Sequence, residues 1–453
     1  MAKGMFGFLK PAPDAPRITD QDEMRKSYKY WRFRSIYSIL IGYMGFYFVR
    51  KSLAVAMPYI GEEFGYSREK LGLILTVAGL TYGVSKFING FGGDRTNPRY
   101  FMALGLILSA GMNVLFGLSS ALIFFFLFWI INSWFQGLGW APCSKTLVNW
   151  FSARERGVKF AIANTACGIG AAGVIVMNGY LVKAYGWRSC FFVPAAIATV
   201  ISLFVLWRLR DRPQSLGLPP VEEYRGEEAD LADTEHGKGA SYKEVVMQYI
   251  FKNPWMWIVC LANFFVYIIR YTVMDWGPTF LMEDKGVDIV EASGIVGGFE
   301  FAGIAGMLVG GWALDKVFKG YGGRVLAIYM GLCALFIFLF LKLPVQYVSL
   351  FGNKVMLNGM LLWGAGFSIY GPQCLVAVLA VNMVPKQAGA AAVGLTGLFG
   401  YMSYVISGWG MGKFVDNYGW GAGLFSLVIF ALIGMLLFLV LWNNNPHLKD
   451  KLD

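Results

Sequence analysis

The feature that most constrains this chain is a series of long apolar segments that recurs along nearly its whole length. A segment of about 20 apolar residues is long enough for a helix to cross a lipid bilayer. We find twelve such segments, at residues 35–58, 69–91, 99–118, 121–149, 157–183, 188–208, 254–281, 290–313, 324–342, 346–379, 387–413 and 420–442. Backbone groups in lipid must be hydrogen-bonded within the protein. The pattern therefore predicts an all-α membrane protein with twelve transmembrane helices.

The composition agrees with this fold class. Of the 453 residues, 57% are hydrophobic and 15% are charged, whereas a soluble domain carries about 25% charged residues. Most of the net charge of +11 comes from Lys and Arg that flank the apolar segments, so it does not indicate a nucleic-acid partner. The six Cys and two His lack the spacing of a metal site, and we expect no cofactor. We also find no pairing of a nucleophile with a base that would indicate an enzyme.

A long polar stretch divides the segments into two sets of six. Lys and Arg are more frequent in the loops on the side of the N-terminal tail, which predicts that both termini are cytoplasmic. A short amphipathic helix is expected at 242–250 within the polar stretch. The expected domains are an N-terminal tail, a six-helix half, a cytoplasmic linker, a second six-helix half and a C-terminal tail, at 1–34, 35–208, 209–252, 253–443 and 444–453.

A repeated spacing brings one arginine into an apolar segment of each half. Positions 43, 47 and 50 are spaced i, i+4 and i+7, which places them on one helical face, and positions 263, 267 and 270 repeat that spacing at an offset of 220. A cation at membrane depth costs roughly 2.5–3.5 kcal/mol on insertion scales, so its presence indicates a function. Parallel repeats of this kind place a substrate site at their interface near the bilayer midplane. The residues are Tyr43, Tyr47 and Arg50, and Asn263, Tyr267 and Arg270.

The two arginines favour a phosphate-bearing ligand. A guanidinium group is a planar fork that binds phosphate through two parallel hydrogen bonds. Arg50 and Arg270 would then meet at the axis that relates the two halves. The alternative is that each arginine extends to a membrane surface or pairs with an internal acid.

Four further charged residues lie within the apolar segments: Lys51, Lys86, Asp275 and Glu300. If all four face the same cavity as the two arginines, the summed charge is +2, which balances a phosphate dianion. We therefore hypothesise that ligand binding relieves a charge imbalance in the empty site. The alternative is a structural ion pair, such as Lys51 with Asp275.

The organic part of a ligand would contact Asn164 and the tyrosines that line the cavity, which are Tyr43, Tyr47, Tyr82, Tyr267, Tyr370 and Tyr401. Aromatic residues in membrane helices also serve as packing groups, so each tyrosine alone is a weak signal. At the ends of the second and eighth segments, Asp94-Arg95 and Asp315-Lys316 repeat at similar places. These charges are candidates for a gating latch between the halves, although simple anchoring at the membrane surface also explains them.

With these residues in view, the chain resembles the organophosphate:phosphate antiporter family of the major facilitator superfamily over essentially its whole length. The motifs that carry the resemblance are Tyr47-Phe48-Val49-Arg50-Lys51-Ser52, Tyr82-Gly83-Val84-Ser85-Lys86-Phe87, Gln136-Gly137-Leu138-Gly139-Trp140, Arg212-Pro213-Gln214-Ser215-Leu216-Gly217-Leu218-Pro219-Pro220, and Tyr267-Ile268-Ile269-Arg270 with Asp275-Trp276. Residues 10–16 and 97–102 look most like the hexose-phosphate transporter and sensor branch.

The resemblance implies exchange of a sugar phosphate for inorganic phosphate across a bacterial inner membrane. It implies that the residues matching Arg50 and Arg270 bind the phosphate, with help from Lys86. Cys167 stands where glycerol-3-phosphate members of the family carry a histidine, which favours hexose 6-phosphate as the substrate. The protein would be a monomer in the lipid bilayer.

Three alternatives to this exchange remain. The first is a sugar-phosphate receptor that signals to a sensor kinase. The second is a glycerol-3-phosphate:phosphate antiporter, and the third is a proton-coupled symporter that uses Asp275 or Glu300.

Overall fold

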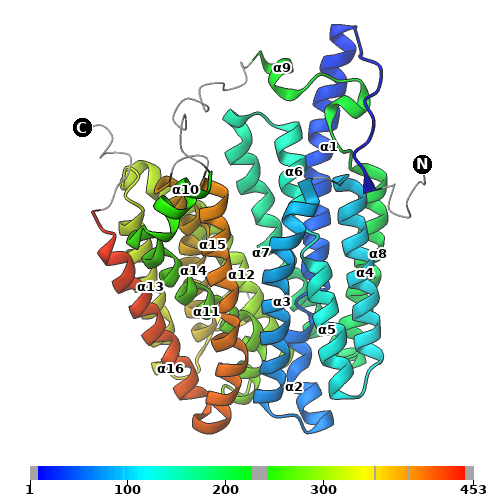
Figure 1. The fold of residues 1–453 in the computed structure, drawn as a ribbon. Coiled ribbons are helices and arrows are strands. Elements are labelled where there is room, and N and C mark those ends of the chain that lie inside the picture. Colours follow the sequence, from blue (N-terminus) through cyan, green and yellow to red (C-terminus); the bar gives the residue numbers. More distant parts are fainter. Residues whose placement is uncertain (1–8, 95, 227–241, 351–352, 385–387, 444–453) are drawn as a thin grey trace. The chain divides into compact units, whose positions relative to one another are not determined.

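The computed structural model describes residues 9–94, 96–226, 242–350, 353–384 and 388–443 (Figure 1). The chain forms two compact units, and each is described by itself. The first consists of Met1–Ser52, Thr81–Val174 and Arg188–Glu235. The second consists of Leu53–Leu80, Ile175–Trp187 and His236–Asp453.

The described residues are mostly helical. The first unit contains α1 (Gln21–Phe48), α4 (Pro98–Leu118), α5 (Leu122–Gln136), α6 (Trp140–Trp150), α8 (Ser189–Arg208), a 3₁₀ turn (Pro213–Leu216) and α9 (Val221–Arg225). The second contains α2 (Ser52–Phe64, whose first residue belongs to the first unit), α10 (Tyr242–Val246), α11 (Pro254–Glu283), α12 (Ile289–Trp312), α13 (Gly322–Lys342), α14 (Leu357–Asn382), α15 (Gly389–Met402) and α16 (Met411–Val440), with π-helical turns at Met247–Phe251, Ala313–Val317 and Val405–Gly410. Helices α3 (Arg68–Asp94) and α7 (Ala153–Tyr185) contribute residues to both units.

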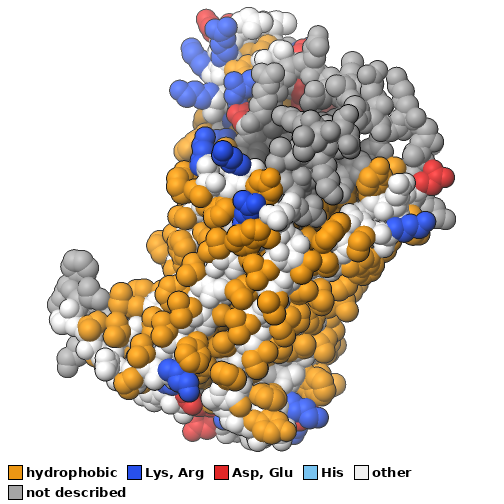
Figure 2. Space-filling view, turned by 90° about the vertical axis from the view of Figure 1, so that its left-hand side faces the viewer, with side chains coloured by type: hydrophobic (Ala, Val, Ile, Leu, Met, Phe, Trp, Pro, Cys, Tyr) orange, Lys and Arg blue, Asp and Glu red, His pale blue; other side chains and the backbone are white. Residues whose placement is uncertain are grey.

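Eleven segments of the described residues are long and apolar enough to cross a membrane. The last of them, Ala391–Val440, is interrupted at Gly419, where φ is 78° and ψ is 169°. This break falls between the eleventh and twelfth predicted spans, so the count agrees with twelve. Figure 2 shows hydrophobic side chains over the middle of one face, with charged side chains toward its ends. The prediction of an all-α membrane fold is confirmed.

Several predicted spans differ in detail from the structure. The fourth, at 121–149, is divided into α5 and α6 by a turn at residues 137–139. The tenth begins at Leu357 and not at residue 346, because the residues before it form an antiparallel hairpin of β1 (Tyr347–Leu350) and β2 (Asn353–Met356). The first predicted span is not a continuous helix, because α1 ends at Phe48 and α2 begins at Ser52.

The break between α1 and α2 is held by polar side chains from other helices. Asn113 of α4 and Asn132 of α5 each donate their side-chain N–H to the carbonyl oxygen of Val49, at 2.8 and 2.9 Å. A buried carbonyl that a helix does not satisfy needs such partners. Arg50 and Lys51 therefore project from a fixed turn between two helices.

The segment that precedes α1 packs against the start of the predicted linker. The backbone N–H groups of Ala15 and Ile18 donate to the carbonyl oxygens of Gln214 and Gly217, at 3.0 and 2.9 Å. Gly217 has a φ of 74°, and a Cβ there would lie 2.2 Å from the carbonyl oxygen of Pro16. The expected helix at 242–250 is present as α10 and the π-helical turn that follows it.

Candidate functional site

Arg50 lies in the first unit, where it contacts a side-chain amide and two aromatic rings. Its Nε donates to Oε1 of Gln136 at 3.0 Å. Its Cζ lies 4.7 Å from the ring centroid of Tyr47 and 4.3 Å from that of Tyr82. The amide of Gln136 is itself positioned by Ser109, whose Oγ accepts from Nε2 at 3.3 Å. These partners orient the guanidinium group, and none of them carries a negative charge.

Aromatic residues of α1 continue from this arginine along the helix. Tyr43 and Tyr47 are buried, with their rings edge-to-face at 5.7 Å. The ring centroid of Trp140 on α6 lies 5.0 Å from that of Tyr43. On α7, a Cβ at Gly170 would lie 3.0 Å from the Cβ of Tyr47, so α7 approaches α1 closely at this point. The structure thus brings Tyr43, Tyr47 and Arg50 together.

The other predicted site residues of the first unit are more scattered. Lys51 is buried, and Lys86 is half-buried on α3. Asn164 and Cys167 lie on one face of α7, where the Cys167 thiol is 4.0 Å from Oδ1 of Asn164. Cys167 also packs against the apolar cluster that contains Tyr43.

Arg270 lies in the second unit and has an acidic neighbour. Its Nη2 donates to the hydroxyl of Tyr370 at 2.6 Å and to Oε2 of Glu300 at 3.4 Å. The Tyr370 hydroxyl donates to the same carboxylate oxygen. Arg270 and Glu300 are 3% and 0% exposed, which identifies the contact as a fully buried ion pair. A charge buried this deeply is stable only when it is paired and hydrogen-bonded.

Glycine residues allow α12 and α14 to approach closely around this triad. A Cβ at Gly303 would lie 2.3 Å from the ring of Tyr370. Cβ atoms at Gly306 and Gly366 would lie 1.8 and 2.2 Å from backbone carbonyl oxygens of the opposite helix. Because Glu300 is on α12 and Tyr370 is on α14, this close packing sets the distance between them.

The remaining predicted residues of α11 lie in two settings. Tyr267 packs against α15, where a Cβ at Gly400 would be 3.2 Å from its ring, and its ring centroid is 6.1 Å from that of Tyr401. Asp275 is buried. Asn263, which completes the repeat with Tyr267 and Arg270, donates its side-chain N–H to the carbonyl oxygen of Thr396 at 2.8 Å.

The predicted gating residues are described only in part. Asp315 and Lys316 are exposed on the π-helical turn that follows α12. Asp94 is the last residue of α3, while its side chain and all of Arg95 lie outside the described residues. The latch between these pairs stays a prediction.

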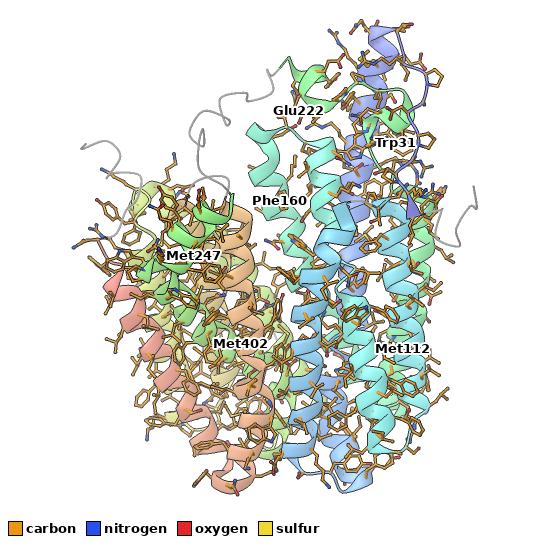
Figure 3. The ribbon with its side chains drawn as sticks, in the orientation of Figure 1. Trp31, Met112, Phe160, Glu222, Met247 and Met402 are labelled. Carbon is orange, nitrogen blue, oxygen red and sulfur yellow. The ribbon has the colours of Figure 1, made fainter. Side chains whose placement is uncertain are left out.

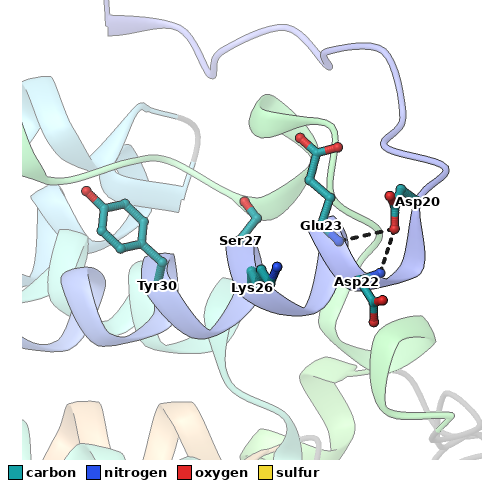
Figure 4. Close-up of a pocket in the computed structure, with 6 residues that line it drawn as sticks. All are labelled: Asp20, Asp22, Glu23, Lys26, Ser27 and Tyr30. Atoms are coloured by element: carbon teal, nitrogen blue, oxygen red, sulfur yellow. Dashed lines mark hydrogen bonds between the residues drawn. The ribbon is translucent and has the colours of Figure 1, made fainter.

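A solvent-open pocket of about 410 Å³ lies at the start of α1 (Figure 4). Within it, the Asp20 carboxylate caps the helix by accepting from the backbone N–H groups of Asp22 and Glu23, at 2.8 and 3.3 Å. Three carboxylates against one lysine disfavour an anionic ligand. We therefore do not assign substrate binding to this pocket. It is lined by Asp20, Asp22, Glu23, Lys26, Ser27 and Tyr30.

Comparison with known proteins decides the family. Residues 39–408 match the sequence model of the Major Facilitator Superfamily. The chain belongs to this family. It is therefore a multi-pass membrane protein of a transporter family. A solved structure of a bacterial homologue of the human lysosomal transporter Spinster agrees on the fold, with a TM-score of 0.74 over 93% of this chain and 98% of that one at 16% identity.

Several relatives are similar over almost the whole chain. A probable hexose phosphate transport protein of Chlamydia pneumoniae is 38% identical, over 96% of both chains. The glycerol-3-phosphate transporter of Bacillus subtilis is 39% identical, over 98% of this chain and 99% of that one. The membrane sensor protein UhpC of Escherichia coli is 38% identical, over 97% and 98%. These relatives confirm the resemblance noted from the sequence.

Three polar residues of the first unit were not among the predicted site residues. Gln136 contacts Arg50 directly, and Asn113 and Asn132 hold the turn from which it projects. A polar side chain within an apolar segment is itself a signal of a buried role. That signal marks Gln136, Asn113 and Asn132, but it does not identify the group that each one contacts.

Proposed function

We propose that this protein exchanges a sugar phosphate for inorganic phosphate by alternating access to one central site. The preferred organic substrate is a hexose 6-phosphate. The proposal is supported by the relatives named as hexose phosphate transport proteins and by the two arginines held at membrane depth. The protein would act as a monomer in a bacterial inner membrane, with both termini cytoplasmic.

The proposal assigns the phosphate to Arg50 and Arg270 together. The observation that carries it is the buried triad of Arg270, Tyr370 and Glu300. Because Glu300 already offsets the charge of Arg270, an incoming phosphate oxygen must replace that carboxylate as the partner of the guanidinium. The hydroxyl of Tyr370 can then donate to the phosphate or to the displaced Glu300.

Around the phosphate, Lys51 and Lys86 would add positive charge, and Asp275 would limit it. The sugar would lie against Tyr43, Tyr47, Tyr267 and Asn164, which offer ring faces and an amide for its hydroxyl groups. When the site is empty, its unbalanced charge should slow the conformational change that turns the site from one side of the membrane to the other. Each outward passage would therefore require a return passage with a bound anion, which is exchange.

The test is exchange in proteoliposomes that contain the purified protein and internal phosphate. External labelled phosphate should enter only when internal phosphate is present, and glucose 6-phosphate should compete better than glycerol 3-phosphate. Y370F should raise the substrate concentration needed for half-maximal exchange. Tyr329 supplies the matched control, because it is equally buried and its hydroxyl donates to the carbonyl oxygen of Gly306 at 3.1 Å. Equal effects of Y370F and Y329F would contradict the assignment of the triad.

A receptor is the second candidate function, favoured by the similarity to the sensor UhpC. A receptor would bind glucose 6-phosphate with the same arginines but would support little flux. Binding of glucose 6-phosphate measured by calorimetry, together with phosphate exchange no faster than in protein-free liposomes, would favour the receptor. Preferential competition by glycerol 3-phosphate would instead identify that ester as the substrate.

A further inference from the structure

Four arginines gather around the C-terminal end of α8 and the start of α4, beside the middle of α1. Arg34 is on α1, Arg99 begins α4, Arg208 ends α8, and Arg210 follows it. All four belong to the first unit, and Arg34 lies 16 positions before Arg50, about four helical turns away. We call them the arginine cluster.

Trp31, which Figure 3 labels on α1, connects two members of the cluster. The Cζ atoms of Arg34 and Arg210 lie 4.6 and 5.1 Å from its ring centroid. Arg34 also donates to the hydroxyl of Tyr30. Two guanidinium groups are thus held beside one indole before any ligand arrives.

The carbonyl groups at the end of α8 accept from the cluster. Arg99 donates through Nε to the carbonyl oxygen of Leu206, and Arg210 donates through Nη1 to those of Trp207 and Leu209 at 3.1 and 2.9 Å. A helix C-terminus carries roughly half a negative charge. That partial charge explains why cations gather here, but it cannot balance four of them.

The negative charge that the cluster would need is missing from the described residues. Within them, no carboxylate lies within 4.0 Å of any of the four guanidinium groups. Arg34 is 8% exposed, and its Nε has no hydrogen-bond partner. Burial and then the charges of Arg99 and Arg34 lower the pKa of Arg210. By contrast, Arg32 on the same helix pairs with Glu155, which also contacts Arg225 at 3.3 Å.

Apolar side chains border the cluster on the surface of α8. Val200, Leu203 and Trp207 are 66%, 56% and 60% exposed, and Arg208 lies with its Cζ 3.6 Å from the Trp207 ring centroid. Exposed Trp beside Arg at the end of a membrane span is typical of the interface between head groups and acyl chains. A ligand there would place a charged end at the arginines and an apolar tail along α8.

We propose that the arginine cluster binds the phosphate-bearing head group of an anionic phospholipid. A phosphodiester oxygen would supply the missing negative charge to Arg34 and Arg210, and the acyl chains would cover Leu203 and Val200. Basic pockets at the end of a helix bundle bind anionic head groups in this manner. This site is separate from the proposed transport site, so its occupancy would stabilise the first unit without competing with substrate.

The test measures thermal unfolding of the full chain in a neutral detergent during titration with single additives. Phosphatidylglycerol should raise the unfolding temperature in a saturable way, whereas phosphatidylcholine and inorganic phosphate should not. The double variant R34Q/R210Q should weaken the phosphatidylglycerol effect by at least about tenfold. The control R25Q/K29Q removes the same charge from exposed positions of α1 and should respond as the wild type does.

Two results would overturn the proposal. Equal weakening in R25Q/K29Q would show that net charge, not this cluster, attracts the lipid. An equal effect of inorganic phosphate would show that the site takes a soluble anion. Native mass spectrometry of the unmodified protein provides a measurement that does not depend on a variant folding: retained phosphatidylglycerol supports the site, and equal retention of phosphatidylcholine contradicts it.

Discussion

The contact between α12 and α14 allows one substitution to be worked out in detail. A Cβ added at Gly306 would lie 1.8 Å from the carbonyl oxygen of Phe367, and 2.6 and 2.9 Å from its C and Cα atoms, whereas ordinary contact begins at 3.4 Å. All three are backbone atoms of a helix and cannot rotate away. G306A therefore requires the two helices to separate by roughly 1.6 Å at this point.

Two consequences of G306A differ in size. Overpacking of this kind costs about 1–3 kcal/mol, and the better helix propensity of Ala returns roughly 0.5–1 kcal/mol. The same separation would stretch the hydrogen bond from Tyr370 on α14 to Glu300 on α12. An O–H···O hydrogen bond weakens beyond its usual length of about 2.5–3.0 Å. We therefore expect a modest loss of stability and a larger loss of exchange, about tenfold.

The assay compares thermal unfolding and phosphate exchange for G306A with those for G311A. Gly311 lies on the same helix, and a Cβ there would meet nothing within 4 Å. G311A should leave exchange unchanged and unfold at the wild-type temperature or slightly above it. If G306A behaves like G311A in both measurements, the close approach of α12 and α14 does not position the triad, and the reasoning is refuted.

Three further predictions concern other buried or paired groups. N113A combined with N132A should lower the free energy of unfolding by about 1–3 kcal/mol, measured by thermal unfolding, because both donors to the carbonyl at the α1 break are lost. T76V should destabilise by a similar amount and T76S much less, because the Thr76 hydroxyl donates to one backbone group and accepts from another beside the π-helical turn that precedes α16. The hydrogen bond from Lys183 holds the pKa of the Asp288 carboxyl below its ordinary value of 3.8 against the opposing effect of burial, and the backbone N–H of Val290 and the charge of Lys183 add to the lowering. Since that stability is present above the ordinary pKa and lost as the pH falls through the lowered one, K183M should be about 0–1 kcal/mol less stable than wild type at pH 7 and equal to it in strong acid.

The transmembrane helices could be predicted from the sequence because membrane thickness acts on each segment locally. The ends of α4 and α8 fall within one residue of the predicted spans at 99–118 and 188–208. The hairpin of β1 and β2 was missed because its residues are apolar enough to extend the tenth span, and the pairing of Tyr347 with Met356 adds no hydropathy signal. Periodicity and hydropathy report on burial, and they do not distinguish a short strand from a helix end.

The site was predicted less completely, because its geometry depends on residues that are distant in the sequence. The repeat identified both arginines, yet it treated the region around Arg50 as a continuous helix. The break after Phe48 depends on Asn113 and Asn132, which lie more than 60 positions away. The contact of Tyr370 with Glu300 likewise joins two helices across 70 positions. Such pairs leave no local pattern, although each residue is visible singly as a polar group in an apolar segment.

The repeat relates the positions of the two arginines, but their surroundings differ. Arg50 is oriented by the amide of Gln136 and by two aromatic rings, while Arg270 is oriented by Tyr370 and the carboxylate of Glu300. If one phosphate binds both, it adds a new partner at Arg50 but displaces an existing one at Arg270. Release of substrate is then assisted from the second unit, because Glu300 competes for its arginine throughout the bound state. E300Q should therefore bind phosphate more tightly and exchange it more slowly, whereas a purely structural Glu300 would lose both binding and exchange.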